Sequence, residues 1–155
     1  KGLSLTTPKV GDVYYLSGDV RIEIVAPNSD YYDDQNNYSI VLKVTYKNIS
    51  FLLTGDAETL SEKEILNNGM DISADVLKIA HHGSNSSTSS KFLEKVNPKY
   101  AIISVGENNT YNHPHQEIIT RLSIRNIIIY RTDMLGTIIA KTDGINLNFE
   151  FERGN

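Results

Sequence analysis

The residues best suited to chemistry lie near the middle of the chain, where a carboxylate and two imidazoles each follow an apolar run. Leu52-Leu53-Thr54-Gly55-Asp56 ends on an aspartate, and Val76-Leu77-Lys78-Ile79-Ala80 leads directly into His81 and His82. Carboxylate oxygens and imidazole nitrogens are ligands that suit zinc, manganese or iron. Strand ends hold such ligands on rigid supports. The spacing therefore predicts a metal-capable site at the ends of two strands.

Each of these residues also has a structural explanation. Asp56 stands between a glycine and a predicted helix over residues 58–67, where an aspartate serves as an N-cap about as readily as a ligand. Adjacent side chains at a strand end point to opposite sides, so His81 and His82 are not expected to bind the same ion. One of them is then a ligand, and the other packs or faces a substrate.

A second polar group follows further along the chain. The stretch 109–115 reads NTYNHPH and carries His113 and His115. Ser84 directly follows Gly83, the glycine that comes after His81 and His82. A hydroxyl group can hydrogen-bond a phosphate, but turn capping explains Ser84 equally simply. For His113 and His115, a helix-capping turn and a role in a functional site are about equally good explanations.

Together these motifs resemble the second half of a metallo-β-lactamase-fold hydrolase, in particular the soluble domain of ComEC-type DNA-uptake proteins. The resemblance runs through nearly the whole chain. Asn112 stands where the family usually has glycine, a change that asparagine tolerates because it also accepts a positive φ. The segments that carry the resemblance are NYS at 37–39, TGDAE at 54–58, DVLKIAHHGS at 75–84, NTYNHPH at 109–115 and RTDMLG at 131–136.

The resemblance implies a role for each of these residues. Asp56 would bridge two metal ions, zinc or manganese, because each carboxylate oxygen can reach a different ion. His82 would be a metal ligand, and His81 would act on the phosphoryl group as a hydrogen-bond donor or general acid. The implied substrate is a phosphodiester such as DNA. The residues expected to contact it are Ser84, His113 and His115.

The chain departs from the family pattern in one important respect. The family's first metal motif, HxHxDH, supplies four ligands, but no histidine precedes His81. A histidine that many relatives place before the bridging aspartate is also absent. Catalytic zinc sites usually have three protein ligands plus water, and Asp56 and His82 make two. We therefore expect this chain to be the distal half of such a domain, and we expect it to bind metal weakly or not at all and to have no activity of its own. The expected partner is the missing N-terminal half.

The periodicity predicts a single α/β (α+β) domain over residues 1–155, with a mixed sheet and helices on one face. Several strands, such as 40–44, 51–53 and 101–105, are near-continuous apolar runs and are expected to be buried on both faces. Because the visible helices can cover only one face, an uncovered second face predicts a homodimer or marginal folding. The predicted strands span residues 13–16, 20–25, 39–46, 49–53, 76–80, 101–105, 127–130, 136–141 and 145–151, and the predicted helices span 58–67, 90–96 and 115–123.

Composition limits the remaining possibilities. A net charge of −4 and a pI near 5.5 argue against a general nucleic-acid-binding surface. The absence of cysteine excludes disulfides and thiolate metal sites. No apolar run reaches the ~20 residues of a membrane span, so we expect a soluble domain of an extracellular or membrane-associated protein. The alternatives are a cell-surface phosphoesterase of the same fold, such as a choline-phosphate esterase, and a noncatalytic interaction module.

Overall fold

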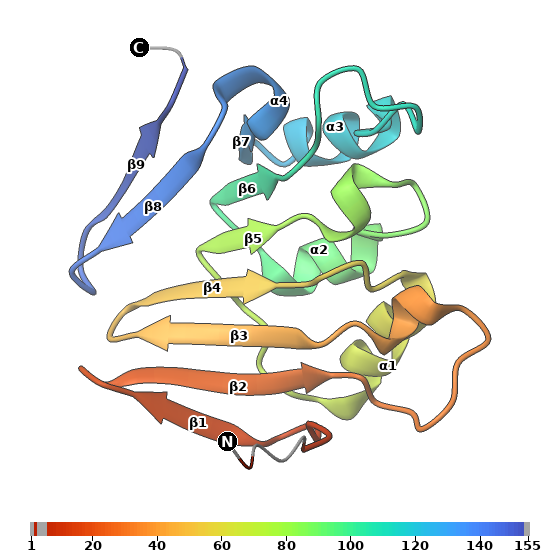
Figure 1. Ribbon diagram of the computed structural model, residues 1–155, viewed down its shortest axis with the longest axis vertical. Coiled ribbons are helices and arrows are strands. Elements are labelled where there is room, and N and C mark those ends of the chain that lie inside the picture. The colour runs from red at the N-terminus through yellow and green to blue at the C-terminus, as the bar shows by residue number, and fades with distance from the viewer. Residues whose placement is uncertain (1, 3–5, 154–155) are drawn as a thin grey trace.

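A seven-stranded mixed sheet and a separate two-stranded hairpin make up the β-structure of the computed structural model, which describes residue 2 and residues 6–153 (Figure 1). Strands β1 to β4 pair antiparallel, and strands β4 to β7 pair parallel. The predicted mixed sheet is therefore confirmed. In spatial and sequence order its strands are β1 (Val13–Leu16), β2 (Val20–Ala26), β3 (Val41–Tyr46), β4 (Ile49–Leu53), β5 (Val76–Lys78), β6 (Tyr100–Ile103) and β7 (Ile128–Arg131).

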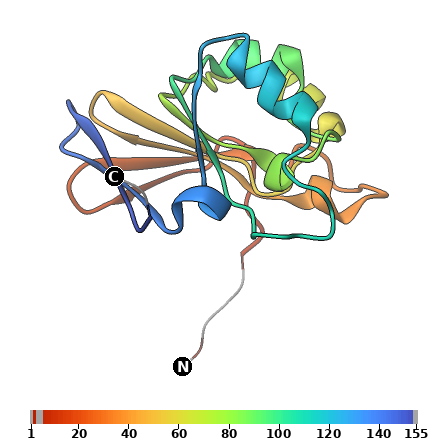
Figure 2. The same cartoon turned by 90° about the horizontal axis from the view of Figure 1, so that it is seen from above.

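Three helices connect the parallel strands and cover one face of the sheet (Figure 2). Right-handed crossovers between parallel strands place successive helices on the same side, which explains why α1 to α3 share a face. None of the described helices has the length and hydrophobicity that a membrane crossing requires. The remaining elements are η1 (Gln35–Tyr38), α1 (Thr59–Asn68), η2 (Ala80–Gly83), α2 (Ser90–Val96), α3 (Gln116–Ser123), α4 (Thr132–Leu135), β8 (Ile138–Thr142) and β9 (Leu147–Phe151).

The core lies between these helices and the sheet. Helix α2 begins where the Ser89 hydroxyl accepts a hydrogen bond from the Phe92 backbone N–H, the N-cap expected for serine. Its apolar side meets the middle strands, so the buried residues come from both layers. The core includes Leu52, Leu77, Ala101 and Ile103 from the sheet and Ile65, Phe92, Leu93, Ile118 and Leu122 from the helices.

The opposite face of the sheet is apolar but only partly covered, and we call it the open face. Paired residues share a face, so the strand register defines its two long rows. Leu53 on this face is 38% exposed, and the prediction that these strands are buried on both faces is therefore wrong. The first row consists of Tyr14, Ile22, Val44, Phe51, Val76, Tyr100 and Ile128. The second row consists of Ile24, Leu42, Leu53, Lys78, Ile102 and Tyr130.

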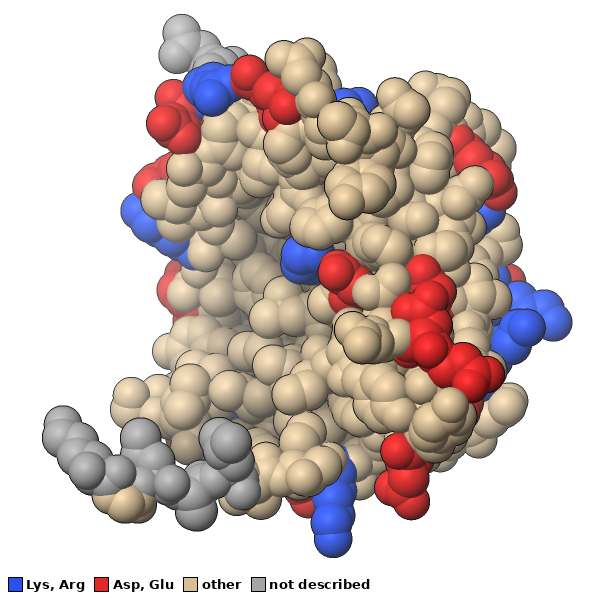
Figure 3. Space-filling model, turned by 45° about the vertical axis from the view of Figure 1, so that its right-hand side comes forward, with Lys and Arg blue, Asp and Glu red and all other residues tan. Residues whose placement is uncertain are grey.

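The β8–β9 hairpin covers one end of the open face. The Phe149 ring lies 4.8 Å from the ring of Tyr100 and 4.9 Å from that of Tyr130. At the tip of the hairpin, the carbonyl of Gly144 accepts a hydrogen bond of 3.1 Å from the backbone N–H of Asn48, in the β3–β4 turn. The rest of the face remains a hollow whose walls are mostly uncharged (Figure 3).

The side chain of Lys43, from strand β3, is buried on the helix-covered face of the sheet. Its ammonium donates hydrogen bonds to a carboxylate oxygen of Asp71 at 2.8 Å and to the Asp71 carbonyl at 3.0 Å. The hydrogen bond from Lys43, with further ones from Ser73, lowers the pKa of the Asp71 carboxyl below its ordinary value. The pair thus compensates a lysine that would otherwise be buried without a partner.

We expect Asp71→Asn to lower the free energy of unfolding by about 1 kcal/mol at pH 7, a modest value because Asp71 is itself exposed. A lowered carboxyl pKa stabilises the fold above the unfolded-state pKa near ~4, and this contribution is lost as the pH falls through the folded-state pKa. Urea unfolding should therefore show a difference from wild type that narrows below about pH 4. Asp30→Asn, in an exposed loop, is the control. A difference of the same size at pH 7 and at low pH would contradict this account.

Candidate active site

The predicted site residues lie at the edge of the sheet where the parallel strands β4 and β5 end. Asp56 follows β4 by three residues, and His81 and His82 follow β5 in the turn η2. The carboxyl ends of parallel strands meet at one edge, which is where α/β sheets usually bind ligands. The backbone N–H of His81 donates to the Gly55 carbonyl at 3.1 Å, and this hydrogen bond joins the two turns.

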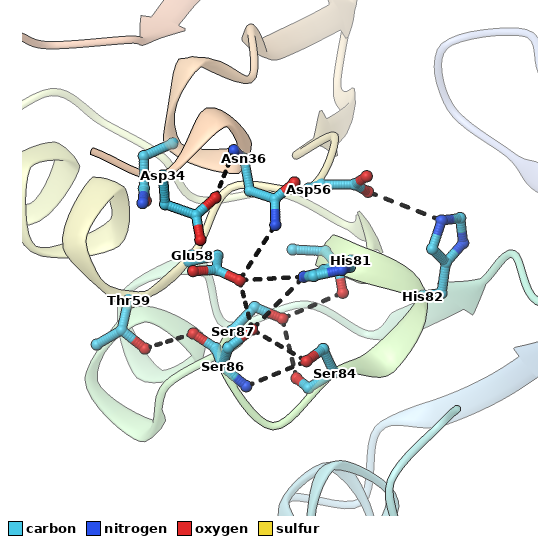
Figure 4. Close-up of polar contacts among 12 residues, drawn as sticks. Asp34, Asn36, Asp56, Glu58, Thr59, His81, His82, Ser84, Ser86 and Ser87 are labelled. Carbon is cyan, nitrogen blue, oxygen red and sulfur yellow. Dashed lines mark hydrogen bonds and ion pairs between the residues drawn. The ribbon is translucent and has the colours of Figure 1, made fainter. Parts of the chain in front are cut away.

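Asp56 and His82 face each other across this edge (Figure 4). The His82 Nε2 and Asp56 Oδ1 atoms are 3.9 Å apart, and both side chains are almost half exposed. The other ring nitrogen of His82, Nδ1, lies 2.7 Å from the Ser104 carbonyl. Since a carbonyl can only accept, Nδ1 carries a hydrogen, and in the neutral ring Nε2 then has its lone pair directed to the site. A backbone carbonyl bound in this way is the usual support of a metal-ligating histidine.

The loop that carries Asp56 is held by residues that precede β3. The Ser39 hydroxyl accepts a hydrogen bond of 3.0 Å from the Asp56 backbone N–H. Gly55 has a φ of +53°, and a Cβ at this position would come within 3.0 Å of the Ser39 Cβ. The buried side chain of Asn37 accepts a hydrogen bond from the backbone N–H of Ser61, in helix α1. The NYS segment thus fixes the aspartate loop to the helix behind it.

His81 points away from Asp56 and into a polar cluster (Figure 4). Its Nδ1 lies 3.2 Å from Oε1 of Glu58, and the same oxygen accepts hydrogen bonds from Ser86 and Asn36. The predicted divergence of the two histidines is present, but its predicted cause is wrong. Strand β5 ends at Lys78, and both histidines occupy left-handed conformations, with φ values of +47° and +55°. The turn, and not the alternation of a strand, separates the two rings.

The other predicted substrate residues are distributed differently. Ser84 is buried, and its hydroxyl is hydrogen-bonded to that of Ser86 at 2.9 Å. The backbone N–H of Asn85 donates to Nδ1 of His115 at 3.0 Å, so this ring supports the turn after η2. The ring of His113 lies 5.6 Å from that of His81 and is therefore part of the site edge.

The charges of the site act on His113 and on Lys78. Burial lowers the pKa of the His113 imidazole, and the neighbouring histidines His115, His81 and His82 lower it further, whereas Asp56 opposes the shift. Burial also lowers the pKa of the Lys78 ammonium on the open face, again opposed by Asp56. A buried cation that retains an anionic neighbour behaves in this way. Asp56 thus contributes a negative charge that partly opposes the effect of burial at both His113 and Lys78.

Comparisons with known proteins agree in pointing to one family. The chain is 41% identical over 138 residues to ComE operon protein 3 of Bacillus subtilis, a match that covers 89% of this chain. It is 36% identical over 120 residues to competence protein ComA of Neisseria gonorrhoeae, covering 77% of this chain. The chain belongs to the ComEC-type family of competence proteins. Recombination protein 2 of Haemophilus influenzae is a further relative, 34% identical over 119 residues.

The ComEC-type chain corresponds to a small part of each of these relatives. It spans 18%, 17% and 15% of the lengths of these three relatives. No protein-family model matches the chain. Among solved structures, it resembles a putative zinc-dependent hydrolase of the metallo-β-lactamase superfamily from Thermotoga maritima, with a TM-score of 0.40 and 16% identity, over 73% of this chain and 57% of that one.

The donor set of the ComEC-type chain fits part of a metal site. Metal bonds of about 2.1 Å allow one ion to contact two donor atoms as far apart as His82 Nε2 and Asp56 Oδ1. Within residues 6–153, however, no group of three or more histidine, cysteine, aspartate or glutamate side chains is placed to hold a metal. Catalytic zinc usually has three protein ligands. These residues therefore fit two ligands of an ion and do not complete its coordination.

Sequence reasoning missed two residues that orient the histidines. Glu58, which accepts from His81, is expected from the sequence only as part of the helix over residues 58–67. The Ser104 carbonyl, which accepts from His82, belongs to a residue expected only in the strand over residues 101–105. The TGDAE motif did contain a signal for Glu58, since it places a second carboxylate two residues after Asp56. No sequence signal marks a backbone carbonyl, because every residue has one.

The turn after the histidines gives a sharp test of site geometry. Gly83 has a φ of +86°, and a Cβ there would lie 2.5 Å from the Cβ of Pro114. Gly11 has a nearly equal φ of +88°, but a Cβ added to it would meet nothing within 4 Å. Both alanine variants incur the left-handed conformational cost of ~1–2 kcal/mol, but Gly83→Ala also displaces the loop of His113 and His115.

We therefore expect Gly83→Ala to lose about 1–3 kcal/mol more stability than Gly11→Ala, because of overpacking against Pro114. Thermal or urea unfolding measures the loss, and NMR signals of the imidazoles of His113 and His115 should move only in the Gly83 variant. Equal stability losses for the two variants, with unchanged imidazole signals, would show that the close contact has no structural role.

Proposed function

We propose that this chain is the distal part of a metal-dependent phosphodiester hydrolase domain in a ComEC-type DNA-uptake protein. The observation that carries the proposal is the convergence of Asp56 and His82, with His82 held by Ser104 so that Nε2 faces the aspartate. The competence proteins among its relatives support DNA as the substrate in preference to choline phosphate. The parent protein would present this domain outside the cell or at the membrane.

The proposed chemistry assigns a distinct role to each side chain. Asp56 and His82 would hold metal, zinc or manganese, which when bound makes hydroxide available near neutral pH and stabilises charge on phosphoryl oxygens. His81 would donate a proton to the departing oxygen through Nε2. Glu58 supports this role because its hydrogen bond to Nδ1 leaves Nε2 directed away from the cluster.

The remaining ligands would come from outside this chain, from a segment that also covers the open face. Two β-sheets that pack face to face bury their apolar sides about 10 Å apart, and the rows of the open face offer such a surface. In the isolated chain, a second copy would take the place of that segment. Light scattering after size-exclusion chromatography distinguishes such a dimer from a monomer.

Metal binding by the isolated chain tests the proposed ligands. Two protein ligands give little chelate advantage, so calorimetric titration with zinc should show only weak binding, which His82→Ala should weaken further. Asn97→Ala, at the far end of helix α2, is a control outside the site. Tight binding of one zinc ion per chain, lost in His82→Ala, would show that the chain assembles a complete site on its own.

Activity tests the reaction itself. In a longer protein that supplies the missing ligands, we expect phosphodiester hydrolysis that depends on zinc or manganese and is removed by chelation. Asp56→Ala should reduce kcat by a factor of at least about a thousand, since the site loses the carboxylate that offsets the metal charge. Asp30→Ala in the exposed loop is the matched control. Wild-type turnover in Asp56→Ala would refute the assignment of this residue.

A further inference from the structure

A small, mostly apolar pocket adjoins the site on the side of the β6–α3 loop. It has a volume of about 210 Å³. His82 contributes to its wall and, through Nε2, also faces Asp56. A molecule in the pocket is therefore next to the proposed metal ligands. The residues that line the pocket are His82, Val105, Gly106, Asn109, Tyr111 and His113.

Two aromatic rings form one rim of this pocket. The rings of Tyr111 and His113 are stacked, with centroids 5.7 Å apart and an angle of 25° between their planes. Tyr111 is 74% exposed, although burying its ring would be favourable. The ring therefore presents a free aromatic surface beside the pocket. Offset stacking of this kind extends readily to a third planar ring.

The loop that carries these rings is held in place before any ligand binds. The side chain of Asn109 accepts a hydrogen bond from the His113 backbone N–H at 2.9 Å and donates to the His113 carbonyl at 2.7 Å. It also donates to the Gly106 carbonyl at 3.1 Å. In Figure 2 the loop between β6 and α3 extends beyond the sheet on the side away from helices α1 to α3. A loop fixed in this way binds a ligand at low entropic cost.

From this geometry we propose that the pocket binds one nucleobase of the substrate, stacked against Tyr111, next to the phosphate at Asp56 and His82. The inference rests on the proposed phosphodiester hydrolysis and names its substrate class as single-stranded DNA. An apolar slot with an aromatic rim fits a planar base, and base–aromatic stacking is tolerant of sequence. A base must leave its duplex stack to enter such a slot, so a single strand is favoured over a duplex.

The chain lacks the overall positive charge that is typical of proteins that hold DNA through its phosphates. A protein that holds DNA mainly through phosphate contacts is basic on its binding face and loses affinity steeply with salt. This chain has a net charge of −4. Stacking of a base on an aromatic ring does not require a basic surface. The base slot gives the acidic domain a means of retaining DNA that does not require a basic surface.

Binding of short DNA to the isolated, metal-free chain tests the slot separately from hydrolysis. The probes are a single-stranded oligothymidylate, an abasic oligomer of equal length and the matching duplex, and binding is followed by NMR. We expect the oligothymidylate to shift the Tyr111 and His113 signals and to bind about tenfold more tightly than the abasic oligomer. Tyr111→Ala should remove that advantage and Tyr111→Phe should keep it. Tyr31→Ala is the control, since Tyr31 is equally exposed at 73% on a different loop.

Several results of these binding experiments would contradict the proposed base slot. Equal affinity for the abasic oligomer or the duplex, an unchanged affinity in Tyr111→Ala, or no binding of oligothymidylate at millimolar concentration would overturn the base slot. These results would leave the proposed hydrolysis standing. Base-dependent binding that requires Tyr111, together with wild-type hydrolysis in Asp56→Ala, would instead retain the slot and refute the proposed chemistry.

Discussion

The site depends on one backbone hydrogen bond, which the His81 N–H donates to the Gly55 carbonyl. It joins the turns that follow β4 and β5, and so brings the carboxylate of one strand to the imidazoles of the next. In the same turn after β5, His81, His82 and Gly83 all adopt positive φ. A left-handed conformation costs a residue other than glycine ~1–2 kcal/mol. Strain of this kind concentrates at functional sites, where the surrounding contacts maintain it.

Two side-chain contacts hold the rings of these histidines in place. His82 donates to the carbonyl of Ser104, after β6, and His81 contacts the carboxylate of Glu58, before α1. The two rings are thus anchored to different parts of the fold and diverge to ring centroids 6.4 Å apart. One imidazole is left facing Asp56 and the other faces the loop of His113, so neighbouring residues can serve separate tasks.

The sequence predicts the strands and the three longer helices, but it does not predict how the residues of the site come together. Alternating and near-continuous apolar runs are local signals, and the nine predicted strands and three predicted helices lie close to their expected positions, whereas η1 and α4 are not among the predicted elements. Helices on one face also follow from the order of the elements, as crossovers are right-handed. The contacts of His81 with Glu58 and of His82 with Ser104 join residues 23 and 22 positions apart. No periodicity encodes such pairs, since they depend on how three strand ends meet.

Lys78 gives the open face a property that its apolar neighbours lack. Both of its partners in the ladder, Leu53 and Ile102, are apolar, and its ammonium donates to the backbone carbonyl of Ile79 at 3.1 Å. A surface that closed over this face would need acceptors for the remaining N–H groups of this ammonium. A cover displaced by a single residue would bury the ammonium against hydrocarbon, at a cost of several kcal/mol. Two apolar sheet faces can pack against each other in several alignments, but the need to place an acceptor beside Lys78 would select one of them.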